Sequence, residues 1–293
     1  MSSTESTYRE ILGQEIFVDV RRLRDLARHG VPPSLRDEVW KYLLAVLKPD
    51  KSEEYSQLRS VQKEYDSLRV LNESTRQSAF RDFDELKGVK QHFKTAKEGA
   101  EYLNLREKVA NVVSAICQQP AGVQYSRSLV PLVVPFCLTM RLEADAYYSS
   151  FALLRLAGER CIEREGLLEE FSQFLTLFRV MFPDLNEWFD TEMISPNEWA
   201  LSWFQTLLAR ELTPDLTQRL WDTYFAGPDG LKLHTFVCLS VVQVLEDSLL
   251  QMDREDILLV LHNLPRISVD ELIIRARNLK ADCASRSLYP FRT

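Results

Sequence analysis

The fold is decided by a chain-breaking turn followed by an amphipathic run, Gly30-Val31-Pro32-Pro33-Ser34-Leu35-Arg36-Asp37-Glu38-Val39-Trp40-Lys41-Tyr42-Leu43-Leu44. The prolines stop any preceding helix, and Ser34, with an acidic residue three positions later, predicts the N-cap of a new one. Apolar side chains then recur at helical spacing on one face: Leu35, Val39, Leu43 and Leu47. We therefore expect a docked helix in which Trp40 is buried.

The same signals recur later in the chain. Ser195-Pro196-Asn197-Glu198 combines a cap, a proline at the first helical position and a glutamate at the third. Thr213-Pro214 and Ser268-Val269-Asp270-Glu271 predict two further helix starts, and an apolar stripe runs from Leu167 to Met181. Glycine is scarce, with 9 in the chain, and no alternating strand pattern stands out. These patterns predict an all-α protein.

One region lacks a sustained apolar face. Residues 50–95 are rich in Ser, Lys, Glu and Asp, and we expect a long helix near Glu54–Leu71. A loosely ordered connection over residues 72–98 should follow, because little burial opposes the backbone entropy there. The predicted layout is a lead-in at 1–22, one domain of two helical halves at 23–280, and a tail at 281–293.

Charge and composition limit the classes of partner, location and cofactor that the sequence predicts. The chain has 293 residues and a formal net charge of −7, with no basic cluster dense enough to follow a phosphate backbone, so nucleic acid is excluded as a partner. The polar start and the absence of a run of ~18 apolar residues predict a cytoplasmic protein without a transmembrane segment. Five cysteines without C-x-x-C spacing indicate reduced, buried thiols, and four scattered histidines predict neither a metal site nor a cofactor.

Four segments, in order, resemble the TBC family of Rab GTPase-activating proteins. The opening one matches at Gly30, Pro32, Arg36, Trp40 and Leu43-Leu44. The others are Glu143-Ala144-Asp145-Ala146-Tyr147, Trp203 through Trp221-Asp222-Thr223-Tyr224-Phe225, and His262-Asn263-Leu264-Pro265 with Asp270 to Leu279. The resemblance covers roughly residues 23–280 and implies the family's helical fold. It gives Arg36, Trp40, Tyr125, Trp221 and Asp222 architectural or partner-binding roles, with Asp222 expected to cap or pair locally.

The resemblance also implies two catalytic fingers that act on a bound GTPase, an arginine in I-x-x-D-x-x-R and a glutamine in Y-x-Q-G. A supplied arginine accelerates GTP hydrolysis by about 10³–10⁵. The glutamine motif aligns with Tyr125-Ser126-Arg127-Ser128, which places Arg127 at the glutamine position. A guanidinium has donors only, so Arg127 cannot orient a water as a glutamine amide does.

The arginine motif has no clear counterpart between Leu71 and Arg106. Arg81 has a serine, Ser78, where the family has aspartate. Lys87 follows an aspartate at the family spacing, but an ammonium lacks the planar fork of a guanidinium. The candidate finger positions are therefore Arg81, Lys87 and Arg127.

Two functions follow from this. The first is a pseudo-GAP, a TBC-fold module that binds or scaffolds proteins in small-GTPase, membrane-traffic or growth signalling, is not itself a hydrolase, and has weak or absent activator activity. The alternative is an active GTPase-activating protein for a Rab-type GTPase that uses a displaced arginine. A third hypothesis is an unrelated helical adaptor protein. The expected partner is a Rab-type small GTPase or a coiled-coil scaffold protein, and peripheral recruitment to endomembranes is compatible with a cytoplasmic location.

Overall fold

The structure, a computed structural model, describes residues 3–52, 54–68, 72–93, 99–119, 123–161 and 164–288. Its helices are α1 (Ser3–Leu12), α2 (Val20–Ala27), α3 (Arg36–Leu43), α4 (Glu54–Leu68), α5 (Glu73–Asp84), α6 (Lys87–His92), α7 (Gly99–Gln118), α8 (Leu129–Thr139), α9 (Glu143–Cys161), α10 (Arg164–Met181), α11 (Pro183–Thr191), α12 (Pro196–Thr206), α13 (Pro214–Ala226), the 3-10 helix η2 (Gly230–Leu233), α14 (His234–Leu249), α15 (Arg254–His262) and α16 (Val269–Ser285). Within these ranges the only β-type pairing is a single bridge between Phe17 and Asp50. The all-α prediction is confirmed.

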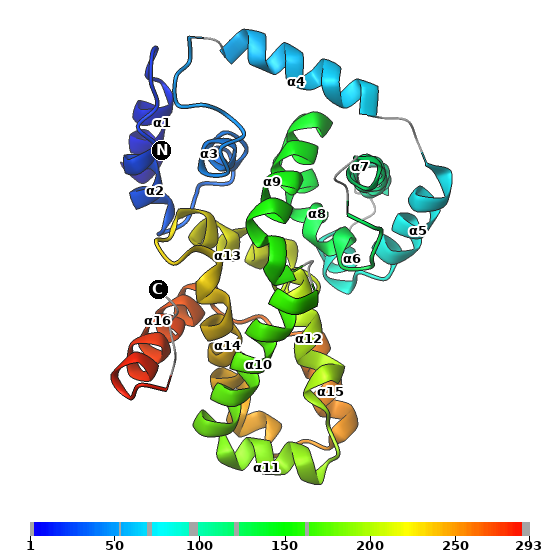
Figure 1. Ribbon diagram of the computed structural model, residues 1–293, viewed down its shortest axis with the longest axis vertical. Helices are drawn as coiled ribbons and strands as arrows, with labels where there is room; N and C mark the ends of the chain where they lie inside the picture. The colour runs from blue at the N-terminus through cyan, green and yellow to red at the C-terminus, as the bar shows by residue number, and fades with distance from the viewer. Residues whose placement is uncertain are drawn as a thin grey trace.

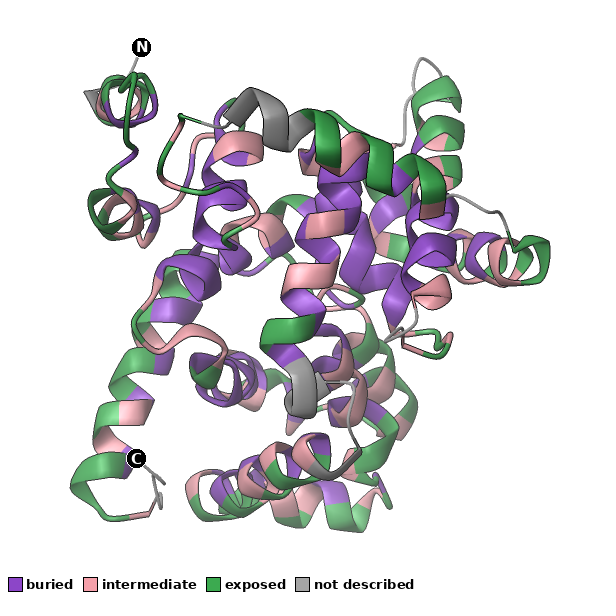
Figure 2. Ribbon diagram, turned by 45° about the horizontal axis from the view of Figure 1, so that its top comes forward, coloured by how far each residue is buried: buried purple, intermediate pink, exposed green. Residues whose placement is uncertain are grey.

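The helices form two groups, and α13 lies where they meet. Figure 1 shows α1 to α9 in the upper part of the molecule and α10 to α12 with α14 to α16 in the lower part. Although α13 comes late in the sequence, it packs against α2, α3 and α8. Buried residues line the faces that the helices turn toward one another (Figure 2). The second half is therefore joined to the first through α13, together with the packing of α10 on α9 and of α12 on α8 and α9.

An aromatic cluster fills this junction. Trp40 is fully buried, as predicted, and its ring centroid lies 5.5 Å from that of Phe136 and 5.1 Å from that of Phe225. Trp221 completes the cluster, with its ring centroid 5.5 Å from that of Phe136. Edge-on and tilted ring contacts at such distances are favourable beyond the area they bury.

Most of the predicted helix starts are confirmed. Ser195 and Glu198 form a capping box, α13 begins at Pro214, and Ser268 accepts a hydrogen bond from the Glu271 amide at 3.4 Å. The cap predicted at Ser34 is wrong. The Leu35 amide bonds to the Pro32 carbonyl at 2.9 Å, so a turn carries the chain past Ser34 before α3 begins at Arg36.

The expectation of loose order after residue 71 is also wrong where the structure describes it. The Asn72 side chain caps α5 by accepting from the Thr75 amide at 3.2 Å, and α5 buries Ala79, Phe80 and Phe83. This stripe is short, but packing against α7 completes its burial. Residues 94–98 lie outside the described residues. The long helix predicted near Glu54–Leu71 is present as α4. The last residues of that predicted range, 69–71, also lie outside the described residues.

Helices continue across both predicted domain boundaries. The first boundary falls within α2 and the second within α16. Ahead of the first boundary, α1 buries Tyr8 and Ile11, and the Tyr8 hydroxyl donates to the Gly30 carbonyl at 3.1 Å. The lead-in is thus packed on the opening turn. In the described part of the chain, no helix is long and apolar enough to cross a membrane.

Candidate functional site

Asp222 connects the opening segment to α13 through a buried network. Its Oδ1 accepts from Arg36 Nε at 3.0 Å and Trp40 Nε1 at 2.7 Å, while its Oδ2 accepts from Arg36 Nη2 at 3.0 Å and the Val31 amide at 2.9 Å. Asp222 is 0% exposed. Its partner Arg36 lies 186 residues earlier in the chain, so the expectation of local pairing is wrong. The adjacent Trp221 is also buried and donates through Nε1 to the Leu207 carbonyl at 3.3 Å.

The candidate finger region lies where α5 meets the segment before α8. Tyr125 donates its hydroxyl to Asp82 Oδ2 at 2.6 Å. Burial, together with this hydrogen bond, raises the pKa of the tyrosine. Arg127 Nε lies 3.3 Å from Asp82 Oδ1, and its guanidinium also pairs with Glu85. The side chain of Arg127 is still 59% exposed. Tyr125 and Arg127 are thus brought together by two acidic side chains of α5 and its C-cap.

The other two finger positions lie apart from this pair. Arg81 is exposed on α5 and donates to the Ser78 hydroxyl at 3.4 Å. Lys87 is exposed at the start of α6. The aspartate three residues before it, Asp84, accepts from Arg106 Nε at 3.0 Å and Nη2 at 2.8 Å, which lowers the pKa of the carboxyl. This aspartate therefore orients an arginine of α7 in place of a finger on α6.

A cavity of about 160 Å³ lies beside Arg127. Its lining includes Asp82, Glu85, Arg127, Ser128, Gln205 and Arg210. Sequence reasoning missed Gln205 and Arg210, since both lie in an ordinary helix and turn without a motif. The left-handed residues Leu207 and Leu208, with φ of 50° and 63°, reverse the chain after α12, and this reversal brings Arg210 back to the cavity. An amide and two guanidiniums thus share one cavity.

A buried carboxylate supports the α12 wall of this cavity. Glu211 is 5% exposed and accepts from Ser202 Oγ at 2.5 Å and Thr206 Oγ1 at 3.3 Å. Both hydroxyl-bearing residues also line the cavity. Burial raises the pKa of Glu211 to about 7, although the two hydroxyls and nearby Arg210 act in the opposite direction.

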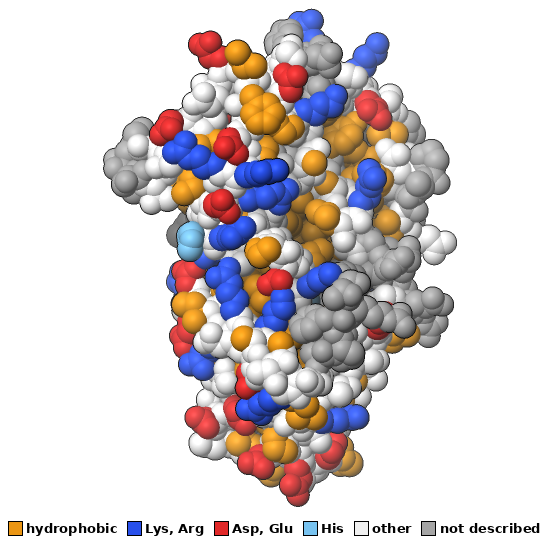
Figure 3. All heavy atoms as spheres, turned by 60° about the vertical axis from the view of Figure 1, so that its left-hand side comes forward, with side chains coloured by type: hydrophobic (Ala, Val, Ile, Leu, Met, Phe, Trp, Pro, Cys, Tyr) orange, Lys and Arg blue, Asp and Glu red, His pale blue; other side chains and the backbone are white. Residues whose placement is uncertain are grey.

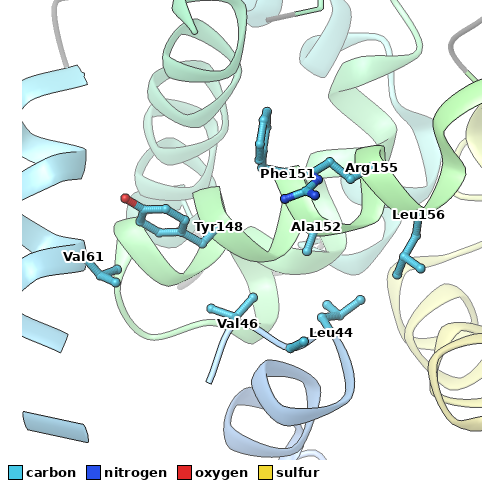
Figure 4. Close-up of a pocket in the computed structure, with 9 residues that line it drawn as sticks. Leu44, Val46, Val61, Tyr148, Phe151, Ala152, Arg155 and Leu156 are labelled. Carbon is cyan, nitrogen blue, oxygen red and sulfur yellow. The ribbon is translucent and has the colours of Figure 1, made fainter. Parts of the chain in front are cut away.

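A larger hollow, of about 570 Å³, lies between the end of α3, α4 and α9. Its lining is mainly apolar, and Leu44 and Val46 face Ala152 of α9 across the space (Figure 4). Arg155 and Tyr148 supply its polar groups. Apolar side chains do not perform acid, base or phosphoryl chemistry. The 160 Å³ cavity beside Arg127, called the finger cavity below, is therefore the stronger candidate site.

The family model of the Rab-GTPase-TBC domain matches residues 33–250. The chain therefore belongs to the Rab-GTPase-TBC domain family, which confirms the resemblance. It is similar to TBC1 domain family member 22A of Homo sapiens, with 24% identity over 290 residues that cover 86% of this chain and 54% of that protein. It is also similar to the GTPase-activating protein gyp1 of Schizosaccharomyces pombe, with 25% identity over 283 residues, covering 85% and 54%. The chain thus spans about half the length of these curated relatives.

Two solved structures share the fold. The Ypt/Rab-GAP domain of Gyp1p superposes with a TM-score of 0.78 at 20% identity, covering 97% of this chain and 98% of that one. The flagellar RabGAP TBC domain of Chlamydomonas gives a TM-score of 0.65 at 18% identity, covering 92% and 88%. At these identities the likeness establishes architecture, and function has to be argued from the side chains.

Proposed function

We propose that this chain is a TBC-fold pseudo-GAP, a module that binds a protein partner and accelerates GTP hydrolysis little or not at all. The observation that carries the proposal is the pairing of the Arg127 guanidinium with two carboxylates. In the motif alignment Arg127 falls at the position of the family's glutamine, and its guanidinium faces the carboxylates of Asp82 and Glu85. Two nitrogens of this guanidinium, Nε and Nη2, already face carboxylates, and the group has no acceptor for a water proton.

The pairing alone does not disable Arg127. Exposed ion pairs contribute about 0–1 kcal/mol each, so a GTP γ-phosphate could compete for the guanidinium. The missing function is orientation of the attacking water, which needs a group that both accepts and donates. A guanidinium in the glutamine's place retains part of the charge stabilisation and loses this orientation.

The second candidate function is an active GTPase-activating protein with displaced fingers. The observation that favours it is the finger cavity, where Gln205 and Arg210 lie beside Arg127. An amide with one or two guanidiniums is the chemical set that the reaction needs. This hypothesis makes Gln205 the water-orienting group and Arg127 or Arg210 the source of positive charge.

A hydrolysis assay separates the two functions. The whole chain is added to a panel of GTP-loaded Rab-type GTPases under single-turnover conditions, and the rate is compared with each GTPase alone. We expect less than about tenfold acceleration, because loss of a properly held arginine and glutamine removes most of the family's effect. An acceleration above about 10³-fold that disappears in Arg127→Ala, Gln205→Ala or Arg210→Ala, but persists in the exposed control Arg179→Ala, would establish the active alternative.

Binding is measured separately from turnover. We propose a Rab-type GTPase or a coiled-coil scaffold protein as the partner, in the cytoplasm or at an endomembrane surface. Titration calorimetry with GTP-loaded and GDP-loaded GTPases tests the first partner class, and affinity capture followed by mass spectrometry tests the second. A GTPase that binds without acceleration supports the pseudo-GAP. If neither class of partner binds at micromolar concentration, the proposed role as a binding module is wrong.

A further inference from the structure

The hollow of about 570 Å³ between the end of α3, α4 and α9, here named the apolar hollow, has no part in the proposed function. One face of α9 forms its floor, where Tyr148, Ala152 and Leu156 follow one another at intervals of four residues. Residues at this spacing lie on one side of a helix, so they form a stripe about 12 Å long. Ala152, in the middle, has only a methyl group and leaves space between its two larger neighbours.

The walls of the apolar hollow are fixed to the start of α9. Lys41 Nζ of α3 lies 2.9 Å from Asp145 Oδ2 of α9, and both side chains are buried. The Tyr65 hydroxyl of α4 donates to Glu143 Oε1, also of α9, at 2.7 Å. Directly after α3, the Val46 amide donates to the Lys41 carbonyl at 2.8 Å and closes the end of that helix. Because both walls are anchored in this way, the hollow exists before any ligand binds, as is usual for small-molecule sites.

Among the described residues, Arg155 is the one charged side chain that lines the apolar hollow. Figure 4 shows its guanidinium lying back along α9, beside Phe151 and Ala152. In the part of the chain that the structure describes, no carboxylate pairs with Arg155. An arginine on a helix surface is usually just hydrated. This one instead places unpaired N–H donors at the edge of an apolar space.

The other end of the apolar hollow has the opposite electrostatic character. Tyr148 lies there beside Val61 of α4 (Figure 4). Burial, together with the neighbouring Glu64 carboxylate of α4, raises the pKa of the Tyr148 hydroxyl, which therefore stays protonated at neutral pH. An anionic group is disfavoured beside Glu64 and favoured beside Arg155, two helical turns further along α9. The hollow can thus orient a ligand that has one negatively charged end and an apolar tail.

The size of the apolar hollow fits a small ligand better than a protein partner. Nine residues of the described ranges line it, whereas a standard protein interface takes about 20–30 residues from each side. Leu156, at 58% exposed, is the one large apolar side chain among them that is mostly exposed. The volume of about 570 Å³ lies within the range of small-molecule sites, about 300–1,000 Å³. Figure 3, in which the side that holds α3 in Figure 1 comes forward, shows hydrophobic side chains gathered in a recess with Lys and Arg side chains beside it.

We propose that the apolar hollow binds a free fatty acid, with the carboxylate at Arg155 and the alkyl chain between Val46 and Ala152. A guanidinium presents paired N–H donors that match a carboxylate. A linear alkyl chain suits a hollow that follows one stripe of a helix, and burial of each CH₂ strengthens binding by up to about fourfold. The finger cavity is formed by α5, α8 and α12, away from this hollow, so the inference does not require the pseudo-GAP proposal to hold.

Titration calorimetry on the whole chain tests the charged end of the site with sodium dodecanoate below its micelle concentration. We expect one saturable site. Arg155→Gln should weaken binding by about tenfold or more, the usual effect of losing a hydrogen bond to a charged group. Arg179→Gln is the matched control, because Arg179 is also exposed on a helix and is not part of the hollow. Dodecyltrimethylammonium, which has the same tail and a cationic head, should bind more weakly than dodecanoate because Arg155 repels it.

Two further measurements test the apolar end of the site. Ala152→Phe should fill the hollow and abolish dodecanoate binding, while far-ultraviolet dichroism and urea unfolding show that the variant is folded. In a series of fatty acids from hexanoate to tetradecanoate, affinity should rise with chain length and then stop rising once the hollow is filled. If Ala152→Phe does not fold, this series and Arg155→Gln decide the question.

Several outcomes would overturn the proposal. They are the absence of dodecanoate binding at millimolar concentration, equal affinity in Arg155→Gln and the wild type, and an affinity that rises with chain length without a limit, which indicates adsorption to the general surface. Analytical ultracentrifugation tests a different occupant, a second copy of the chain. A wild-type dimer that becomes a monomer in Ala152→Phe would show that a protein surface fills the hollow and that the fatty-acid site is wrong.

Discussion

Replacing Glu211 by glutamine should stabilise the folded chain at pH 8 and have little effect at pH 5. This carboxyl is buried behind the finger cavity, where the hydroxyls of Ser202 and Thr206 are its hydrogen-bond donors. Burial raises its pKa from 4.5 to about 7. Glutamine keeps a carbonyl acceptor in the same place and carries no charge, so it imitates the protonated acid.

The sign follows from the proton balance between the folded and unfolded chains. The unfolded chain releases the Glu211 proton near pH 4.5, whereas the folded chain retains it until about pH 7. Between these values folding binds a proton, so stability falls as pH rises through the window. A pKa that rises from 4.5 in the unfolded chain to about 7 in the folded chain corresponds to a loss of folding stability of about 3 kcal/mol at most. Above pH 7 the wild type bears this full cost, and the glutamine variant does not.

Urea unfolding at pH 5, 6, 7 and 8 measures the effect as the difference in unfolding free energy between Glu211→Gln and the wild type. We expect the difference to grow by about 1–3 kcal/mol in favour of the variant from pH 5 to pH 8. Glu169→Gln is the control at an exposed position, where substitutions usually stay within about 0.5 kcal/mol. A difference that does not change with pH, or a variant that is less stable at pH 8, would refute the reasoning.

Three further outcomes are expected from the packing. Asp222→Ala should lower the unfolding free energy in urea by about 3–5 kcal/mol, because it leaves the Arg36 guanidinium buried without its partner, and a loss below 1 kcal/mol would contradict this. Asn72→Ala should cost about 1 kcal/mol through loss of the α5 cap, with Ser74→Ala at an exposed position of the same turn as the comparison. Hydrogen exchange should be slow at the Phe80 and Phe83 amides, since both side chains are buried, and fast exchange there would restore the expectation of a loose segment.

Local patterns predicted much of the fold. Ser195 and Glu198 formed the expected capping box, because a cap depends on residues within one turn of each other. Trp40 is buried because its helix carries an apolar stripe that only packing can satisfy. The prediction that Ser34 caps the next helix was wrong because a serine before a helical run can belong to a preceding turn. The local pattern does not show where that turn ends. The stripe of α5 was too short to be recognised without knowledge of α7.

The candidate site was less predictable because its contacts are distant in sequence. The partner of Asp222 lies 186 residues away, and no periodic pattern links the two positions. Arg127 was located through the family motif, but its pairing with Asp82 and Glu85 depends on how α5 docks. Arg210 reaches the finger cavity, beside Gln205 of α12, through a left-handed turn built from two leucines, which propensities do not favour.

The two sets of family positions in this chain are under different physical constraints. Asp222, Arg36 and Trp40 form one buried network, so a change at any of them strands a polar group or opens a cavity and costs several kcal/mol. Arg127 is 59% exposed and makes ion pairs worth about 0–1 kcal/mol each, so a change there barely affects folding. A substitution at the position that aligns with the glutamine finger is therefore compatible with a stable member of the fold. For this reason the match to the family establishes the architecture around Asp222, whereas the activity has to be measured at the positions around Arg127.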